Sequence, residues 1–302
     1  MTPERFDASV VVAVAARDYG VLRRQIVALQ RQRTALHFEV LIGDNGGSLE
    51  LAQLPSGLPV RIVAASGVGG ASYARNRAAE QAAGNSLLFC DADDVVGPDW
   101  VEAHVAALRT RPFTAGSSLG VKSSDDRLER AEAGSWPEER FPSKLIRHEG
   151  VDVAPTNNMG IRRELFRDVG GFSSDYRRMQ DVALSLAVRR RGVTPAPVPD
   201  ATVMYVQYDR GPLAQRGIRR QIGIARVLLS DEFGYGPSPA GVLLRAHIRL
   251  ARTLARGRAD RIKGELAELG GCWHGVIGGN GTLRRVFRRT VTPGAHDRTP
   301  ER

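Results

Sequence analysis

Residues 87–94 read LLFCDADD, four apolar residues that run directly into a cluster of three aspartates. A segment that is apolar on both faces is typical of a strand at the centre of a parallel sheet, where helices cover both sides. Ligands of open α/β sheets bind beyond the carboxyl ends of such strands. The stretch therefore predicts a buried central strand that ends at a charged site.

The sequence before this stretch alternates between strand and helix patterns. We expect strands at residues 10–16, 38–42, 60–65 and 85–90, and helices at residues 19–32 and 72–83. The second helix is expected to stop at Gly84 and Asn85. Alternation on this spacing indicates an α/β fold with a largely parallel sheet flanked by helices.

The pattern after this stretch is less regular. Helices are expected at residues 99–109 and 179–192 and extended chain at 193–208, while the polar segment 113–150 is expected to be rich in loops. Beyond Pro212 two apolar stripes at helical spacing predict a helical C-terminal extension. Their members are Ile218, Ile222, Ala225 and Leu229, then Leu244, Ile248, Ala251 and Ala255.

The chain has 302 residues and a net charge of +10, which is unevenly distributed. Residues 1–210 hold 26 basic and 26 acidic side chains, whereas residues 211–302 hold 17 basic and 7 acidic ones. Two cysteines far apart in sequence do not form a disulfide framework. The apolar run at residues 10–16 is too short to cross a bilayer and lacks the flanks of a signal peptide, so we expect a cytoplasmic protein.

Asp91 and Asp93 are expected to point the same way, because side chains two positions apart in extended chain share one face. Two such carboxylates repel each other unless a cation lies between them. Mg²⁺ or Mn²⁺ suits this pair, with water and substrate phosphates completing its ligands. The alternative is a helix N-cap and first turn, an interpretation that fits Asp94 or Asp99 best.

The order of several motifs resembles the family 2 glycosyltransferases, which have the GT-A fold. The motifs are DNGG at residues 44–47, VGGASYARNRAAEQAAGNSLLFCDADD at 68–94, NNMGIRRELFRDVGGF at 157–172, and QD at 180–181. A lone DxD occurs in many proteins, whereas this ordered set is specific. The resemblance runs from about residue 10 to residue 192.

The resemblance implies a role for each matching position. Asp44 would meet the nucleobase, typically uracil, and Arg75 and Asn76 would lie by the nucleotide. Asp91 would lie near the ribose or the metal, and Asp93 would be the principal metal ligand at the sugar diphosphate.

The catalytic base implied by the resemblance is Asp181. The family usually has Glu before this aspartate, and here Gln180 takes its place. One base without a second carboxylate nucleophile indicates inversion at the anomeric carbon. The alternative for Asp181 is an N-cap or first-turn residue of the helix that follows.

We therefore expect an inverting, metal-dependent glycosyltransferase that uses Mn²⁺ or Mg²⁺ and a nucleotide-sugar donor, most readily a UDP-sugar. Residues 1–112 would bind the nucleotide sugar, residues 113–210 the acceptor, and residues 211–302 would form a basic helical extension. The acceptor is unknown. A cell-surface polysaccharide or glycolipid is expected first, and a secondary metabolite or a peptide is the alternative.

Two other classes of protein are alternatives to a glycosyltransferase. A nucleotidyltransferase would need a glycine-rich basic loop after the first strand, where the sequence has AARDYG. A non-catalytic protein that binds nucleotide sugar or nucleic acid would keep the fold without turnover.

The basic extension suggests a membrane contact. Arg245, Arg249, Arg252 and Arg256 share one helix face beside the second apolar stripe, as a peripheral contact with anionic lipid through residues 240–290 requires. RRVFRR at 284–289 adds a second basic cluster. The alternative is a solvated face on a packed helix, since the apolar stripe must also pack. No nucleic-acid-binding motif is present.

Overall fold

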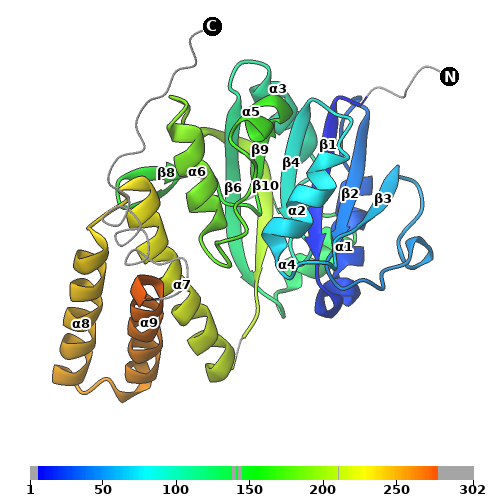
Figure 1. Ribbon diagram of the computed structural model, residues 1–302. Helices are drawn as coiled ribbons and strands as arrows, with labels where there is room; N and C mark the ends of the chain where they lie inside the picture. Colours follow the sequence, from blue (N-terminus) through cyan, green and yellow to red (C-terminus); the bar gives the residue numbers. More distant parts are fainter. Residues whose placement is uncertain (1–5, 138–140, 142–144, 210, 278–302) are drawn as a thin grey trace, which may run out of the picture. The chain divides into compact units, whose positions relative to one another are not determined.

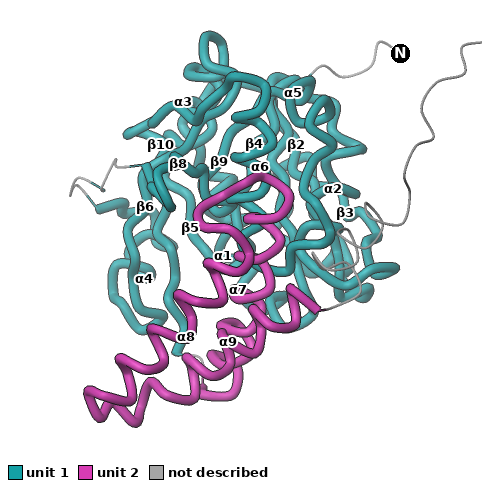
Figure 2. The backbone as a smooth tube through the Cα atoms, turned by 60° about the vertical axis from the view of Figure 1, so that its left-hand side comes forward, with its two compact units in different colours: residues 1–209 teal, residues 210–302 magenta. Residues whose placement is uncertain are grey.

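Two compact units, residues 1–209 and residues 210–302, make up the chain in the computed structural model (Figure 2). The structure describes residues 6–277 except 138–140, 142–144 and 210. The first unit is a mixed α/β fold and the second is helical (Figure 1). The predicted α/β fold with a helical C-terminal extension is thus confirmed, while the division of the first unit into donor and acceptor halves stays a prediction.

One eight-stranded sheet forms the centre of the first unit, with strand order β3-β2-β1-β4-β9-β6-β10-β5. The strands are β1 (Ala8–Val14), β2 (Phe38–Asp44), β3 (Val60–Ala64), β4 (Ser86–Asp91), β5 (Val95–Val96), β6 (Phe113–Lys122), β9 (Met159–Arg162) and β10 (Ala196–Gln207). β9 is antiparallel to β4 and β6, and β5 is antiparallel to β10. The other neighbouring pairs are parallel.

β4 is the predicted central strand, and its side chains alternate between two apolar layers. Leu88 and Cys90 pack with residues of α1 (Tyr19–Gln30) and α3 (Trp100–Leu108). Leu87 and Phe89 pack on the opposite face with residues of α2 (Ala71–Glu80), α5 (Arg163–Asp168) and α6 (Gln180–Arg189). All four side chains are fully buried, which explains why this strand is apolar on both faces.

The predicted helix over residues 72–83 ends earlier than expected. α2 stops at Glu80, and Gly84 is not its stop signal. A Cβ at position 84 would lie 2.5 Å from the carbonyl carbon of Ala8. Gly84 is therefore required because the chain passes close to β1 at this point.

The segment 113–150 was expected to be rich in loops, and this expectation is wrong for much of it. It contains β6, α4 (Asp126–Glu132) and β7 (Ile146–His148), which pairs with β8 (Val151–Val153). β6 was missed because polar residues occupy its buried positions, among them Thr114 and Ser117. Burial alone does not require apolar side chains when hydrogen-bond partners are available.

The side chain of Thr114 and the main-chain carbonyl of Ser117 in β6 belong to a buried hydrogen-bond network around Asn158. Its Oδ1 accepts from Trp100 Nε1 at 2.8 Å, and its Nδ2 donates to the carbonyls of Ser117 and Ala201 at 2.9 Å each. His104 Nε2 lies 3.0 Å from the same Oδ1, and His104 Nδ1 lies 2.9 Å from Thr114 Oγ1. This network connects α3, β6 and β10 to the chain before β9.

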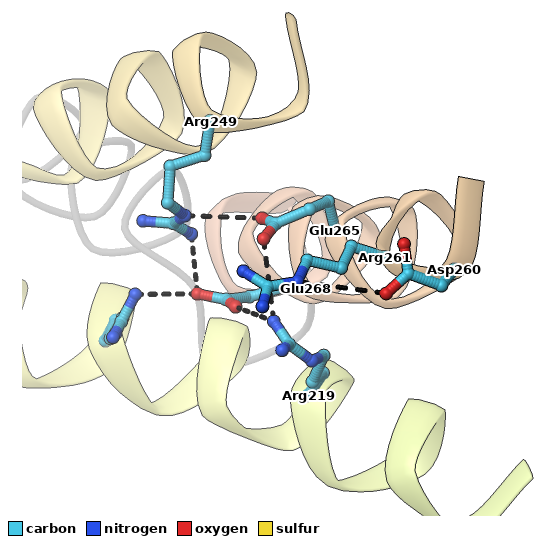
Figure 3. A network of polar contacts seen from close by, with 7 residues as sticks. Arg219, Arg249, Asp260, Arg261, Glu265 and Glu268 are labelled. Atoms are coloured by element: carbon cyan, nitrogen blue, oxygen red, sulfur yellow. Dashed lines mark hydrogen bonds and ion pairs between the residues drawn. The ribbon is translucent and has the colours of Figure 1, made fainter. Parts of the chain in front are cut away.

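The second unit consists of α7 (Pro212–Phe233), α8 (Pro239–Ala255) and α9 (Ala259–Ile277). Glu265 and Glu268 of α9 lie between Arg219 of α7 and Arg249 of α8 (Figure 3). Glu268 is nearly buried and accepts from both Arg226 and Arg249 at 2.6 Å. Acidic side chains of α9 thus neutralise basic ones of its two neighbours.

The second predicted apolar stripe does not pack into this unit. Leu244 and Ile248 are exposed, and the buried residues of α8 are Val242, Ala246 and Thr253. Arg249 binds Glu265 and Glu268, so the four arginines of α8 do not form the free basic face that a membrane contact was expected to use. None of the helices within the described residues is long and apolar enough to span a membrane. The RRVFRR cluster lies outside the described residues.

The buried network predicts an acid-sensitive contribution to stability. Burial lowers the pKa of His104 from 6.5 to about 4, and its hydrogen bond with Asn158 offsets part of this change. The unfolded chain therefore binds the proton at higher pH, so stability is lost as pH falls from 6.5 towards 4. We expect the loss to reach about 3 kcal/mol.

Urea unfolding across this pH range, with His104→Gln as comparison, checks the contribution. The variant should show a shallower pH dependence than the natural chain. Parallel curves for the two proteins would contradict a neutral buried His104.

Candidate functional site

Arg75 of α2 connects the three segments that the motifs predict to form the site. Its guanidinium is buried, and Nη2 donates to Asp91 Oδ1 at 2.5 Å at the end of β4. Nη1 donates to Gln180 Oε1 at 3.0 Å at the start of α6. The side chain also lies over the ring of Phe172, with Cζ 5.7 Å from the ring centroid. The ARN, DADD and QD motifs therefore meet at one cation.

Asn76, the next residue, holds the glycine turn that precedes α6. Its Nδ2 donates to the carbonyl of Phe172 at 2.7 Å, and its Oδ1 accepts from the Phe172 N–H at 3.0 Å. Gly171 has a φ of 70°, and a Cβ there would approach Asn76 Oδ1 to 2.8 Å. Both polar atoms of the Asn76 side chain thus serve this turn, and its proposed position beside the nucleotide stays a prediction.

Asp181 lies in the first turn of α6, close to Arg75 and Asp91. The N-cap position is Met179, which adopts left-handed backbone with a φ of 62°. Burial raises the pKa of Asp181, the Val182 N–H and the charge of Arg75 lower it, and the charge of Asp91 raises it. The net result is a pKa above 3.8, so this carboxylate takes up a proton more readily than an exposed aspartate.

Asp94, the last aspartate of the DADD motif, does not begin a helix, so the predicted N-cap role is wrong for this residue. Its side chain is fully buried. Oδ1 accepts from the Val206 N–H of β10 at 3.0 Å, and Oδ2 accepts from Asn157 Nδ2 at 3.1 Å. Asp99 occupies the N-cap position of α3 instead, without a capping hydrogen bond, and its carboxylate pairs with Arg33.

The aspartates at the end of β4 bring several negative charges close together. Burial raises the pKa of Asp94 well above its usual value, and the charges of Asp91 and Asp93 raise it further. Such crowding of negative charge favours a bound cation. No group of three or more His, Cys, Asp or Glu side chains in the described part of the chain is arranged to hold a metal ion. A cation here would need one or two carboxylates together with substrate oxygens.

Asp44 organises the loop after β2. Its Oδ1 accepts from Tyr19 Oη at 2.6 Å and from the Gly46 N–H at 2.9 Å, and its Oδ2 accepts from the Leu49 N–H at 3.0 Å. Burial alone would raise the pKa of Asp44, but these hydrogen bonds hold it below the usual value. A nucleobase contact by this carboxylate stays a prediction.

Sequence reasoning missed Asn45, which joins the loops after β2 and β3. Its Nδ2 donates to the carbonyl of Val68 at 2.8 Å, and its Oδ1 accepts from the Gly70 N–H at 2.9 Å. Gly70 is the N-cap residue of α2, so Asn45 helps to set where the helix that carries Arg75 begins. The signal was the position of Asn45, directly after Asp44 at the carboxyl end of a strand.

Comparison with known proteins identifies the family. The model of glycosyl transferase family 2 matches residues 9–170, which is more than half of the chain. The chain belongs to glycosyl transferase family 2. The predicted resemblance is confirmed, and the protein is a glycosyltransferase.

Among relatives of this glycosyltransferase, the uncharacterized glycosyltransferase YwdF of Bacillus subtilis (strain 168) is 25% identical over 244 residues, which cover 76% of this chain and 85% of YwdF. The mannosyltransferase PcManGT from Pyrobaculum calidifontis, solved with GDP-Man and Mn²⁺, is 16% identical. It has a TM-score of 0.59, with 91% of this chain and 88% of that chain covered.

The S. aureus protein TarS, solved with UDP-GlcNAc, is 15% identical with a TM-score of 0.50, and the match covers 72% of this chain and 66% of that one. The likeness to PcManGT and TarS concerns the fold, which confirms the predicted GT-A architecture.

The ion pair of Arg75 makes a testable contribution to stability. Arg75→Gln leaves Asp91 without its cation, and because Asp91 is 30% exposed we expect a loss of about 2 kcal/mol, below that of a fully buried pair. Arg77→Gln is the matched control, since Arg77 forms an exposed pair with Glu80 on the same helix and should cost less than about 0.5 kcal/mol. Urea unfolding measures both, and equal losses would contradict the assignment.

Proposed function

We propose that this glycosyltransferase transfers a sugar from a nucleoside diphosphate donor to an acceptor hydroxyl with inversion. The observation that carries the proposal is the junction at Arg75, which places the end of β4 beside the first turn of α6. UDP-sugars are the first donor class to test. GDP-sugars are the second class to test. Both classes are included because TarS was solved with UDP-GlcNAc and PcManGT with GDP-Man.

Asp93 and Asp91 are the proposed ligands of Mn²⁺ or Mg²⁺. Burial is the largest cause of the raised pKa of Asp94, and the charges of Asp91 and Asp93 raise it further, so negative charge gathers where the cation is proposed to bind. When bound, the ion would neutralise charge that develops on the diphosphate leaving group. Asp91 also pairs with Arg75, so the guanidinium and the carboxylate fix each other's position beside the donor.

Asp181 is the proposed base that accepts the proton of the acceptor hydroxyl. Its raised pKa favours proton uptake, and the charge of Arg75 limits the rise. Gln180 accepts a hydrogen bond from Arg75 without adding a charge, so the guanidinium remains shared electrostatically between Asp91 and Asp181. The proposed inversion rests on a single base and direct displacement.

The proposed setting is synthesis of a cell-surface polysaccharide or glycolipid in the cytoplasm. Cys90 and Cys272 are both free and buried, which suits a reducing compartment. Tailoring of a secondary metabolite or peptide is the alternative activity. A non-catalytic nucleotide-sugar-binding protein is the alternative class, and it would show donor binding without turnover.

Removing the base should separate turnover from donor binding. We expect Asp181→Asn to lower the rate of nucleotide release by at least about 100-fold while donor affinity is kept. Asp168→Asn is the control, because Asp168 is half-exposed on α5 and pairs with Arg191. Donors are first selected by thermal shift with Mn²⁺. Unchanged turnover in Asp181→Asn would remove this residue from the base role.

The pH profile of the same reaction reports the base directly. The carboxylate is lost as a base when pH falls through its raised pKa, so the acid limb should lie above the 3.8 of an ordinary aspartate. Arg75→Lys keeps a positive charge but not the fork geometry, and it should move this limb without abolishing it.

Metal binding is tested at Asp93. In Asp93→Asn, stabilisation by donor plus Mn²⁺ should fall to the level seen with donor alone, measured by thermal shift. Asp99→Asn serves as control, since its carboxylate lies at the N-cap of α3. Full Mn²⁺-dependent stabilisation in Asp93→Asn would contradict the proposed ligand.

A further inference from the structure

Helix α8 has two apolar faces, and the helical unit uses only one of them. Val242, Ala246 and Thr253 are buried against α7 and α9. The opposite side consists of Leu244, Ile248, Ala251 and Ala255, which we call the outer face of α8. Leu244 is 61% exposed and Ile248 is 40% exposed.

The outer face is a continuous stripe. Successive helix residues turn by about 100°, so its four members fall within an arc of about 60°. Packing within the helical unit therefore does not explain why these four positions are apolar. Exposed apolar side chains at contiguous positions indicate an interaction surface.

The charge beside the outer face is entirely basic on this helix. Arg252 and Arg256 flank the stripe and are exposed, and α8 contains no acidic residue. Arg249 lies on the same side of the helix as these arginines, but it is neutralised by Glu265 and Glu268, which are 12% and 7% exposed. Glu265 and Glu268 thus neutralise basic side chains between the helices of the unit (Figure 3). The arginines along the stripe match an anionic surface.

An exposed tryptophan of α9 borders this face. The ring of Trp273 lies 6.1 Å from that of His247 in an edge-to-face contact, and it is 44% exposed. Ile277, four positions later, is 64% exposed. A tryptophan with one edge exposed to solvent is favoured where apolar and polar environments meet.

We propose that the outer face of α8, together with Trp273, lies on an anionic membrane surface. Leu244 and Ile248 enter the boundary between headgroups and acyl chains, and Arg252 and Arg256 contact lipid phosphates. This contact is independent of the proposed transfer reaction, so either can fail without the other.

Vesicle flotation of the full-length chain tests the contact. Binding is expected to phosphatidylglycerol–phosphatidylcholine vesicles and to be at least about tenfold weaker for phosphatidylcholine alone. Leu244→Ser/Ile248→Ser and, separately, Arg252→Gln/Arg256→Gln should each weaken binding by about tenfold or more. Leu51→Ser/Leu213→Ser is the matched control, because both leucines are exposed but lie on other elements. Circular dichroism verifies that each variant is folded.

Three results would overturn the proposal. Equal binding to neutral vesicles would remove the role of the arginines. Unchanged binding of the Leu244/Ile248 variant would identify a purely electrostatic surface, as a nucleic acid or other polyanion would use. A dimer that dissociates in this variant, without vesicle binding by the natural chain, would show that a second copy covers the face.

Discussion

The buried guanidinium of Arg75 is the constraint on which the site depends. A buried charge must be paired and hydrogen-bonded. The two Nη atoms of Arg75 meet this requirement with Asp91 of β4 and Gln180 of α6, while its buried Nε has no partner among the described residues. These partners come from segments far apart in the chain, so the pairing fixes where α6 begins relative to the central strand. The position of Asp181 beside Asp91 follows from that single pairing.

The rest of the site is set by side chains that hydrogen-bond to backbone. Asn45 holds the start of α2, Asn76 holds the turn at Phe172, and Asp94 joins the DADD turn to β10. Asn158 does the same for two strands, because its amide ties β6 and β10 together. Short polar side chains therefore hold the loops in place at the carboxyl edge of the sheet, and the strands form the edge to which these loops are attached.

The sheet could be predicted because alternation of apolar residues reflects burial directly, as in β4. β6 could not, because its buried Thr114 hydrogen-bonds to distant residues that local sequence does not reveal, and the hydroxyl of Ser117 is buried without a partner among the described residues. Asp94 was misread for a similar reason: an aspartate before a helix suggests a cap, yet its partners are Asn157 and Val206. The stripe of α8 was recognised, but its spacing cannot tell a packed face from a free one.

The two cysteines have a consequence beyond their redox state. Cys90 is fully buried in the centre of the sheet, and Cys272 is fully buried in the helical unit, so each compact unit carries one inaccessible thiol. Burial raises the pKa of both thiols, that of Cys272 to about 11, which suppresses the reactive thiolate. Alkylation of each cysteine therefore requires its own unit to open, and the natural chain contains a pair of built-in reporters that distinguish unfolding of the sheet from unfolding of the helices.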